Sequence, residues 1–159
     1  MPNDIKERPN TLPWPPLIYG AAILIGALSG FVLPTPWPQS PASDFLFAIG
    51  GLMIAGALFI DFSAMRTMSR AKTTIMPNKG SDHLVASGPF SFSRNPIYLA
   101  NTMITAGLAL MSGIIWFLPL ALAAAILTQH LAIKREEAHL EARFGKAFRE
   151  YAKKVRRWI

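Results

Sequence analysis

The sequence predicts an all-α, polytopic membrane protein with about four transmembrane helices and a C-terminal amphipathic helical tail in the cytoplasm. Of the 159 residues, 52% are hydrophobic and only 16% are charged, and the mean hydropathy is positive, which is unusual for a soluble domain of this size. The length fits a single domain, 1–159. Basic residues gather beside uncharged runs, which favours anionic headgroups over nucleic acid as their partner. The absence of cysteine excludes disulfides and thiolate chemistry.

Long uncharged runs supply the predicted spans. The first covers about 17–33 between prolines, and the second covers about 45–61, ending at Asp61. Each is close to the roughly 20 residues that a spanning helix needs. The run from Asn95 to Ile133 is about twice that length, so it must fold back on itself. A turn at Ser112-Gly113 divides it into spans at about 97–111 and 114–133.

The basic residues predict how the spans are oriented. All 16 Lys and Arg residues lie before the first span, between the second and third spans, or after Ile133. The positive-inside rule therefore places both termini and the middle loop in the cytoplasm. A cleaved signal peptide is disfavoured, because Asp4 and Glu7 cancel the two basic residues, Lys6 and Arg8, that precede the first apolar run.

The tail after the last span alternates apolar and charged residues. Its apolar residues recur at spacings of three and four, at Leu140, Phe144, Phe148, Tyr151, Val155 and Trp158. This pattern predicts an amphipathic helix that lies at the cytoplasmic headgroups. Gly145 is expected to divide it into two short helices.

Two polar clusters stand at the cytoplasmic ends of the last two spans. "SRNPIY", residues 93–98, opens the third span, and "KREEAHLEARFG", residues 134–145, follows the fourth. The two spans form an antiparallel hairpin, so the clusters are expected to be neighbours. Asn95 is a good cap for the third helix, whose free amides should face Glu136 and Glu137. Headgroup contacts or simple salt bridges are the alternative for each of these residues.

The segments "LVASGPFSFSRNPIYLA" and "REEAHLEARFGKAFREYAKKVRRWI" resemble the isoprenylcysteine carboxyl methyltransferase and phospholipid N-methyltransferase group of integral-membrane enzymes. The resemblance covers about 84–159. It implies an S-adenosylmethionine pocket built by an Arg-His-Pro-x-Tyr motif, a Glu-Glu pair and a Phe-Gly-x-x-(Tyr/Phe)-x-x-Tyr tail. The matching residues are Arg94, Pro96, Tyr98, Glu136, Glu137, Phe144, Gly145, Phe148 and Tyr151. Asn95 replaces the motif histidine, so a titrating role does not carry over, which argues against carboxyl methylation in particular.

The charges of this cofactor suggest a role for each candidate within 83–159. Glu136 or Glu137 is expected to pair with the ammonium, Tyr98 to offer its ring or hydroxyl, and Arg94 or Asn95 to hold the carboxylate. The expected cofactor-binding residues of the preceding loop are His83, Leu84, Val85, Gly88 and Pro89. Catalytic positions are assigned to Arg94, Asn95 and Glu137, because methyl transfer chiefly needs alignment and exclusion of water.

The histidines carry weaker expectations. His130 lies on the same helix face as Glu137, so it either joins the cofactor pocket or makes a hydrogen bond to the helix backbone or Asn101. His139 is expected to be solvated, and His83 is expected to be solvated at the edge of the candidate site.

Asp61 ends the second span, where an ionisable group is a functional candidate by default. An interfacial ion pair with Arg66 is the favoured alternative. No pair of histidines and acids has metal-ligand spacing, so no metal is expected.

The expected function is S-adenosylmethionine-dependent methylation of a membrane lipid or another hydrophobic or amphiphilic acceptor, in the inner membrane of a bacterium. A sterol-reductase-like enzyme with a nicotinamide cofactor is one alternative, which the small number of spans disfavours. A non-enzymatic small membrane protein is another, which leaves the clustering of Arg94, Tyr98 and the two glutamates unexplained. Prenylated cysteine, phosphatidylethanolamine and other hydrophobic acceptors stay open, as does the oligomeric state.

Overall fold

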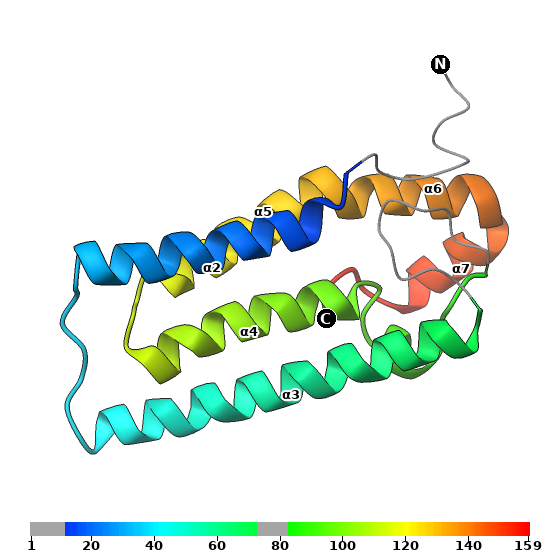
Figure 1. Cartoon of the computed structure of the whole chain (residues 1–159). Helices are drawn as coiled ribbons and strands as arrows, with labels where there is room; N and C mark the ends of the chain where they lie inside the picture. Colours follow the sequence, from blue (N-terminus) through cyan, green and yellow to red (C-terminus); the bar gives the residue numbers. More distant parts are fainter. Residues whose placement is uncertain (1–11, 73–82) are drawn as a thin grey trace.

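The computed structural model describes residues 12–72 and 83–159, which are helical throughout apart from short connections (Figure 1). The elements are α2 (Trp14–Val32), α3 (Ala42–Arg70), the 3₁₀ helix η1 (Gly88–Ser91), α4 (Pro96–Ser112), α5 (Phe117–Thr128), the π-helical turn η2 (Gln129–Ile133), α6 (Lys134–Phe144) and α7 (Lys146–Lys154). The predicted all-α class is confirmed. The charged residues of the N-terminus and Lys79 lie outside the described residues.

Three helices of the described chain are long and apolar enough to cross a membrane: α2, α3 and the continuous helix Phe117–Phe144 formed by α5, η2 and α6. The apolar helix α4 is shorter, with 17 residues, or about 25 Å at 1.5 Å per residue. Two helices extend beyond the predicted spans. The helix that contains the second span continues past Asp61 to Arg70, because the following residues contain no proline or glycine. The last long helix begins at Phe117 and runs on into the charged tail.

The helices pack as antiparallel neighbours in two layers, with α2 beside α5 and α3 beside α4 (Figure 1). The predicted turn at Ser112-Gly113 is confirmed. Gly113 has φ +73°, a left-handed conformation that suits glycine, and its N–H donates to the carbonyl of Ala109 at 2.9 Å. This turn brings the start of α4 to the same end of the molecule as α6.

Small residues allow α3 and α4 to approach closely. A Cβ atom on Gly50 would lie 2.7 Å from the carbonyl oxygen of Gly107. One on Gly107 would lie 2.7 Å from Cγ1 of Ile54. Such contacts between small residues are typical of helix pairs in membranes. We call this pair of glycines the glycine contact.

Large apolar side chains cover the outer surfaces of the long helices. Exposed examples are Phe31, Leu52, Phe59, Phe62 and Leu122. Such a surface is unfavourable in water and suits helices surrounded by lipid.

The tail does not lie with its apolar face on headgroups, contrary to the prediction. Phe148, Tyr151 and Val155 are at most 9% exposed and pack against the chain itself. Their half-buried partners are Leu84, Leu140, Phe144 and Ala152. The predicted break at Gly145 is confirmed: this residue has φ +51° and separates α6 from α7. Burial of the apolar face folds α7 back onto the end of the molecule that carries the polar clusters.

Candidate functional site

A short loop fixes the entry to α4. Gly88 has φ +60°, and a Cβ atom there would lie 2.8 Å from Oγ1 of Thr67 on α3. Glycine therefore allows the loop both its backbone conformation and its close contact with α3. Pro89 is buried, and its carbonyl accepts a hydrogen bond from the N–H of Ser93 at 3.2 Å. The loop is thus held against α3 just before "SRNPIY" begins.

Asn95 occupies the N-cap position of α4, as predicted, but its side chain does not cap the helix. Its Nδ2 instead donates to the backbone carbonyl of Arg157, at 2.8 Å. The residue is 8% exposed, and its own N–H donates to Oγ of Ser93 at 3.1 Å. Pro96 lies in the first turn of the helix, where its missing N–H is not needed. The amide of Asn95 therefore ties α4 to the C-terminal residues.

Tyr98 connects α4 to the first of the two glutamates. Its hydroxyl donates to Oε1 of Glu136 at 2.6 Å. Its backbone carbonyl accepts from the hydroxyl of Tyr19 on α2 at 3.2 Å, and that hydroxyl also lies 2.6 Å from Oγ1 of Thr102. A line of polar contacts therefore runs through the interior from α2 to α6.

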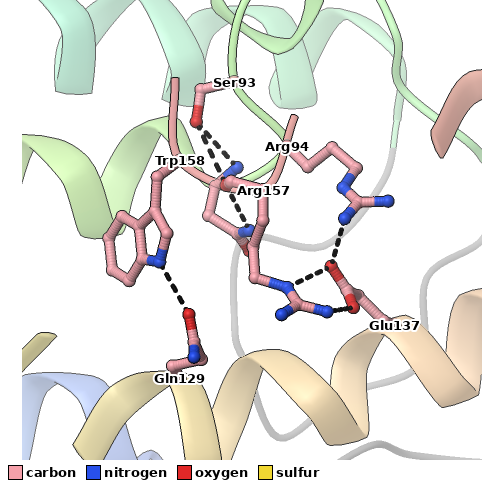
Figure 2. Close-up of polar contacts among 7 residues, drawn as sticks. Ser93, Arg94, Gln129, Glu137, Arg157 and Trp158 are labelled. Carbon is pink, nitrogen blue, oxygen red and sulfur yellow. Dashed lines mark hydrogen bonds and ion pairs between the residues drawn. The ribbon is translucent and has the colours of Figure 1, made fainter. Parts of the chain in front are cut away.

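Glu137 is bound by two arginines (Figure 2). Its Oε1 lies 3.1 Å from Nη2 of Arg94 and accepts from Nε of Arg157 at 2.9 Å, while Oε2 accepts from Nη2 of Arg157 at 2.6 Å. The side chains of Glu137 and Arg94 are only 17% and 15% exposed. The hydrogen bond to Glu137 raises the pKa of Arg157, and partial burial opposes the shift. Nε of Arg94 is buried without a hydrogen-bond partner.

A cavity of about 500 Å³ opens between this ion cluster and the helices α6 and α7. Arg94, Glu137 and Arg157 line it, and Phe148 contributes an aromatic wall. The other lining residues are Lys134, Ala138, Glu141, Arg149, Ala152 and Lys153. A volume of this order lies within the range of about 300–1,000 Å³ that small-molecule sites occupy. The lining carries more basic than acidic groups, which favours a ligand with a negatively charged part.

The predicted loop residues surround this end of the molecule in different ways. Leu84 and Val85 are half-buried, and Leu84 packs into the apolar cluster of α7. Gly88 is exposed, and His83 is exposed as expected. The structure therefore brings Leu84 close to the tail and leaves His83 at the surface.

Three predictions about isolated polar residues need correction. His139 is buried, at 1% exposure, because its helix face turns inward. His130 is exposed, and its Nδ1 lies 3.3 Å from Nζ of Lys134, one turn further along, in place of the expected contact with the helix backbone or Asn101. Asp61 is half-buried with Oδ1 unpartnered, and no ion pair of the described residues joins it to Arg66, which is exposed.

Sequence reasoning missed the contribution of the C-terminus. Arg157 was one basic residue among many in the tail, and no local pattern distinguished it. Trp158 was expected at the headgroups, but its Nε1 donates to Oε1 of Gln129 at 2.9 Å. Gln129 opens the π-helical turn η2, and such turns frequently occur at functional sites.

The family of the chain follows from a comparison with known protein families. The family model described as phospholipid methyltransferase matches residues 45–147, from α3 to the start of α7. No individual curated protein and no solved structure matches the chain significantly. The matched region is more than half of the chain and contains Arg94, Tyr98 and both glutamates of the site. The chain therefore belongs to the phospholipid methyltransferase family and is a membrane methyltransferase.

Proposed function

We propose that the protein transfers a methyl group from S-adenosylmethionine to a lipid or other hydrophobic acceptor at the cytoplasmic face of the membrane. One observation carries the proposal: α4 and α6 place Tyr98 against Glu136 and Arg94 against Glu137, at 2.6 and 3.1 Å. These are the charged and aromatic groups that a zwitterionic, cationic cofactor needs.

The residues of the site fit that cofactor. Nε of Arg94 is a buried donor without a partner, and a ligand carboxylate would satisfy it. Glu136 accepts a hydrogen bond from Tyr98 alone among the described residues. Its carboxylate therefore retains the capacity to bind an ammonium or sulfonium. Glu137 is already shared by two arginines. We accordingly assign the cation to Glu136 and the carboxylate to Arg94.

The loop and the tail supply the proposed apolar part of the site. Leu84 and Val85 are half-buried, Leu84 packs against the apolar cluster of α7, and Phe148 lines the cavity. Gly88 and Pro89 hold the loop against α3 and so set where these side chains lie. We assign the adenosine to this part of the site. His83 and His130 are exposed, and we assign them to the edge of the site.

When bound, the cofactor would supply an electrophilic methyl group, which the acceptor would attack in line with the carbon–sulfur bond, with S-adenosylhomocysteine as the leaving group. The chain then has to align donor and acceptor and to exclude water, without forming a covalent intermediate. Arg94 and Glu136 fix the two charged ends of the amino-acid part, and Tyr98 orients Glu136 through its hydroxyl. The buried tail residues Phe148 and Tyr151 shield the site from water.

The proposed topology has four spans with both termini in the cytoplasm. The described basic residues lie at the end of α3, just before α4, and in and after α6 and α7, at one end of the bundle, which supports this topology. At 17 residues, α4 is a little short for a hydrocarbon core of about 30 Å, so its first turn is expected near the interface. A hydrophobic acceptor can then approach the site sideways from the bilayer.

Cofactor binding by the purified protein tests the proposal. S-adenosylhomocysteine should raise the unfolding temperature, because a ligand that binds only the folded state stabilises it. A dinucleotide should not. Methyl-labelled S-adenosylmethionine incubated with a lipid extract should then transfer label to a lipid fraction. A shift with the dinucleotide alone would favour a reductase, and no shift with either ligand would indicate that the protein binds no such cofactor.

A further inference from the structure

The last residues of the chain leave the helical conformation and cross the start of α4. Val155 follows α7 with φ −117° and ψ 129°, and Arg157 and Trp158 lie beside Ser93 and Arg94, with Trp158 turned toward Gln129 (Figure 2). Val155 is 8% exposed and anchors the segment in the apolar cluster of α7. We call residues 155–158 the C-terminal strap.

Backbone carbonyls attach the strap to the entry of α4. The carbonyl of Arg156 accepts from the N–H of Arg94 at 3.0 Å. The next carbonyl, that of Arg157, accepts from Nδ2 of Asn95 at 2.8 Å. Two adjacent residues of "SRNPIY" therefore bind two adjacent residues of the strap, which fixes its register.

Side chains attach the other edge of the strap to the last long helix. Trp158 donates to Gln129 in η2 at 2.9 Å, and the guanidinium of Arg157 makes two hydrogen bonds to Glu137 on α6, at 2.9 and 2.6 Å. The two bonds fix the plane of the Glu137 carboxylate, which a single contact could not do. The strap thus bridges α4 and α6 at the candidate site.

The two hydrogen bonds from Arg157 to Glu137 limit how Arg94 can bind the same carboxylate. With Oε2 of Glu137 occupied by Arg157, Arg94 reaches only Oε1, through Nη2, and its Nε stays unpaired. Without Arg157, both oxygens of Glu137 would be open to Arg94, whose planar fork prefers a two-bond pair with a carboxylate. Arg94 would then use its free donor on Glu137.

We propose that the C-terminal strap is a wall of the cofactor site and that Arg157 is a positioning residue: it occupies Glu137 and so keeps a donor of Arg94 free for the carboxylate of the cofactor. This inference rests on the proposed function. Arg157 acts through the ligand's carboxylate alone, so its loss should affect two related ligands differently. A merely structural role for Arg157 would affect both ligands equally. Loss of Arg157 weakens a ligand that has the carboxylate and spares a ligand that lacks it.

The test is calorimetric titration of the full-length protein in detergent with two ligands. S-adenosylmethionine carries the carboxylate, and decarboxylated S-adenosylmethionine keeps the sulfonium, the amine and the adenosine. The variants are Arg157→Ala, Arg157→Lys and the control Lys154→Ala, which removes an exposed cation just before the strap. Arg157→Ala should weaken S-adenosylmethionine at least about tenfold, as expected for loss of a partly buried charged contact. Affinity for the decarboxylated ligand should stay within about twofold, since its contacts are unchanged.

Arg157→Lys should fall between the wild type and Arg157→Ala, because an ammonium keeps the charge but cannot make the planar two-bond pair. If Arg157→Ala does not fold, the ratio of the two affinities in Arg157→Lys decides the question. Unchanged affinity for S-adenosylmethionine in a folded Arg157 variant would overturn the inference, and so would an equal loss for both ligands. A wild type that binds neither ligand would overturn the proposed function itself, so the two failures are distinguishable. Lys154→Ala should match the wild type with both ligands.

Discussion

The two ends of the helical bundle are held together by different kinds of interaction. Toward the turn at Gly113, α3 and α4 meet through the glycine contact, where shape alone decides the fit. At the other end, α4 meets α6 and the C-terminal strap through hydrogen bonds and ion pairs among half-buried side chains. Close packing at the glycine contact holds the helices together. The hydrogen bonds and ion pairs at the other end fix the positions of individual charged and polar groups. The candidate site therefore lies where the second kind of contact prevails.

The largest expected difference between the two ends of the bundle is their accessibility to a reagent outside the cell. Because the natural chain has no cysteine, single cysteines at Gln39 and Ser112 can be labelled cleanly. Both residues are exposed at the end of the bundle that carries the turn at Gly113, which we call the apolar end. The proposed topology puts them outside the cytoplasm. A membrane-impermeant thiol reagent should label them in intact cells and should not label a cysteine at Lys154. Labelling of Gln39 and Ser112 from the cytoplasmic side only would contradict the topology.

The next largest effect comes from the glycine contact. Gly50→Ile should destabilise the protein by about 1–3 kcal/mol or more, because the new Cβ meets the backbone oxygen of Gly107, which cannot move aside as a side chain can. The neighbouring Gly51→Ile is the matched control, since nothing lies within 4 Å of its Cβ position. Thermal unfolding in detergent measures the difference. Equal unfolding temperatures for the two variants would show that the helices are not in close contact there.

The two glutamates separate stability from ligand binding at the polar end. Glu137→Ala leaves Arg94 and Arg157 without their shared partner, so it should lower the unfolding temperature more than Glu136→Ala does. Glu136→Ala should weaken S-adenosylhomocysteine at least about tenfold through loss of the proposed cation partner. Calorimetry on both variants gives the affinities. Unchanged affinity in both would remove the acids from the cofactor site.

Asn95 tests the attachment of the strap with a smaller change. Asn95→Asp loses the Nδ2 donor and sets a carboxylate against the carbonyl of Arg157, and it also adds a negative charge near the proposed carboxylate site. Asn95→His keeps an N–H donor and resembles the motif of related enzymes. Affinity for S-adenosylmethionine at neutral pH should fall in the aspartate variant and persist in the histidine variant. The reverse pattern would show that binding depends on other residues of the loop.

Tyr151 should show the smallest effect. Its hydroxyl donates to the carbonyl of Phe90 at 2.7 Å, so Tyr151→Phe should cost about 1 kcal/mol of stability at neutral pH. Burial raises the pKa of Tyr151 to about 12, against the lowering effect of Arg94. The folded state therefore holds this proton more tightly than the unfolded state, and the stability from this group is lost as pH rises from 10 toward 12. Between pH 10 and 12, the free energy of unfolding should fall less steeply with pH in Tyr151→Phe than in the wild type. Identical slopes for the two proteins would contradict the burial of the hydroxyl.

Much of the fold could be predicted because the uncharged runs and the Ser112-Gly113 turn are local signals. The end of α3 could not, since the residues after Asp61 favour a helix as readily as a loop and no breaker marks the boundary. The position of α7 was also out of reach. An amphipathic pattern shows that one face is buried without showing whether lipid or protein covers it.

In the candidate site, too, local sequence signals predicted some contacts, and contacts between distant residues were missed. Arg94, Tyr98 and the two glutamates were predicted to meet because the hairpin makes their helices neighbours. Arg157 was not predicted, since its contact with Asn95 joins residues 62 positions apart and depends on how the tail folds back. The side chain of Asn95 was assigned to the helix cap for the same reason: a cap is a local contact, and the competing partner is distant in sequence.

The proposed cofactor site lies between the start of α4 and α6. Photo-labelling tests it most directly: the purified protein is irradiated with methyl-labelled S-adenosylmethionine, with and without excess S-adenosylhomocysteine, and the labelled peptides are identified by mass spectrometry. We expect label that the competitor removes, on peptides from residues 83–98, 129–137 or the C-terminal tail. Competitor-sensitive label confined to α2 or to the apolar end of α3, or no competitor-sensitive label at all, would contradict it.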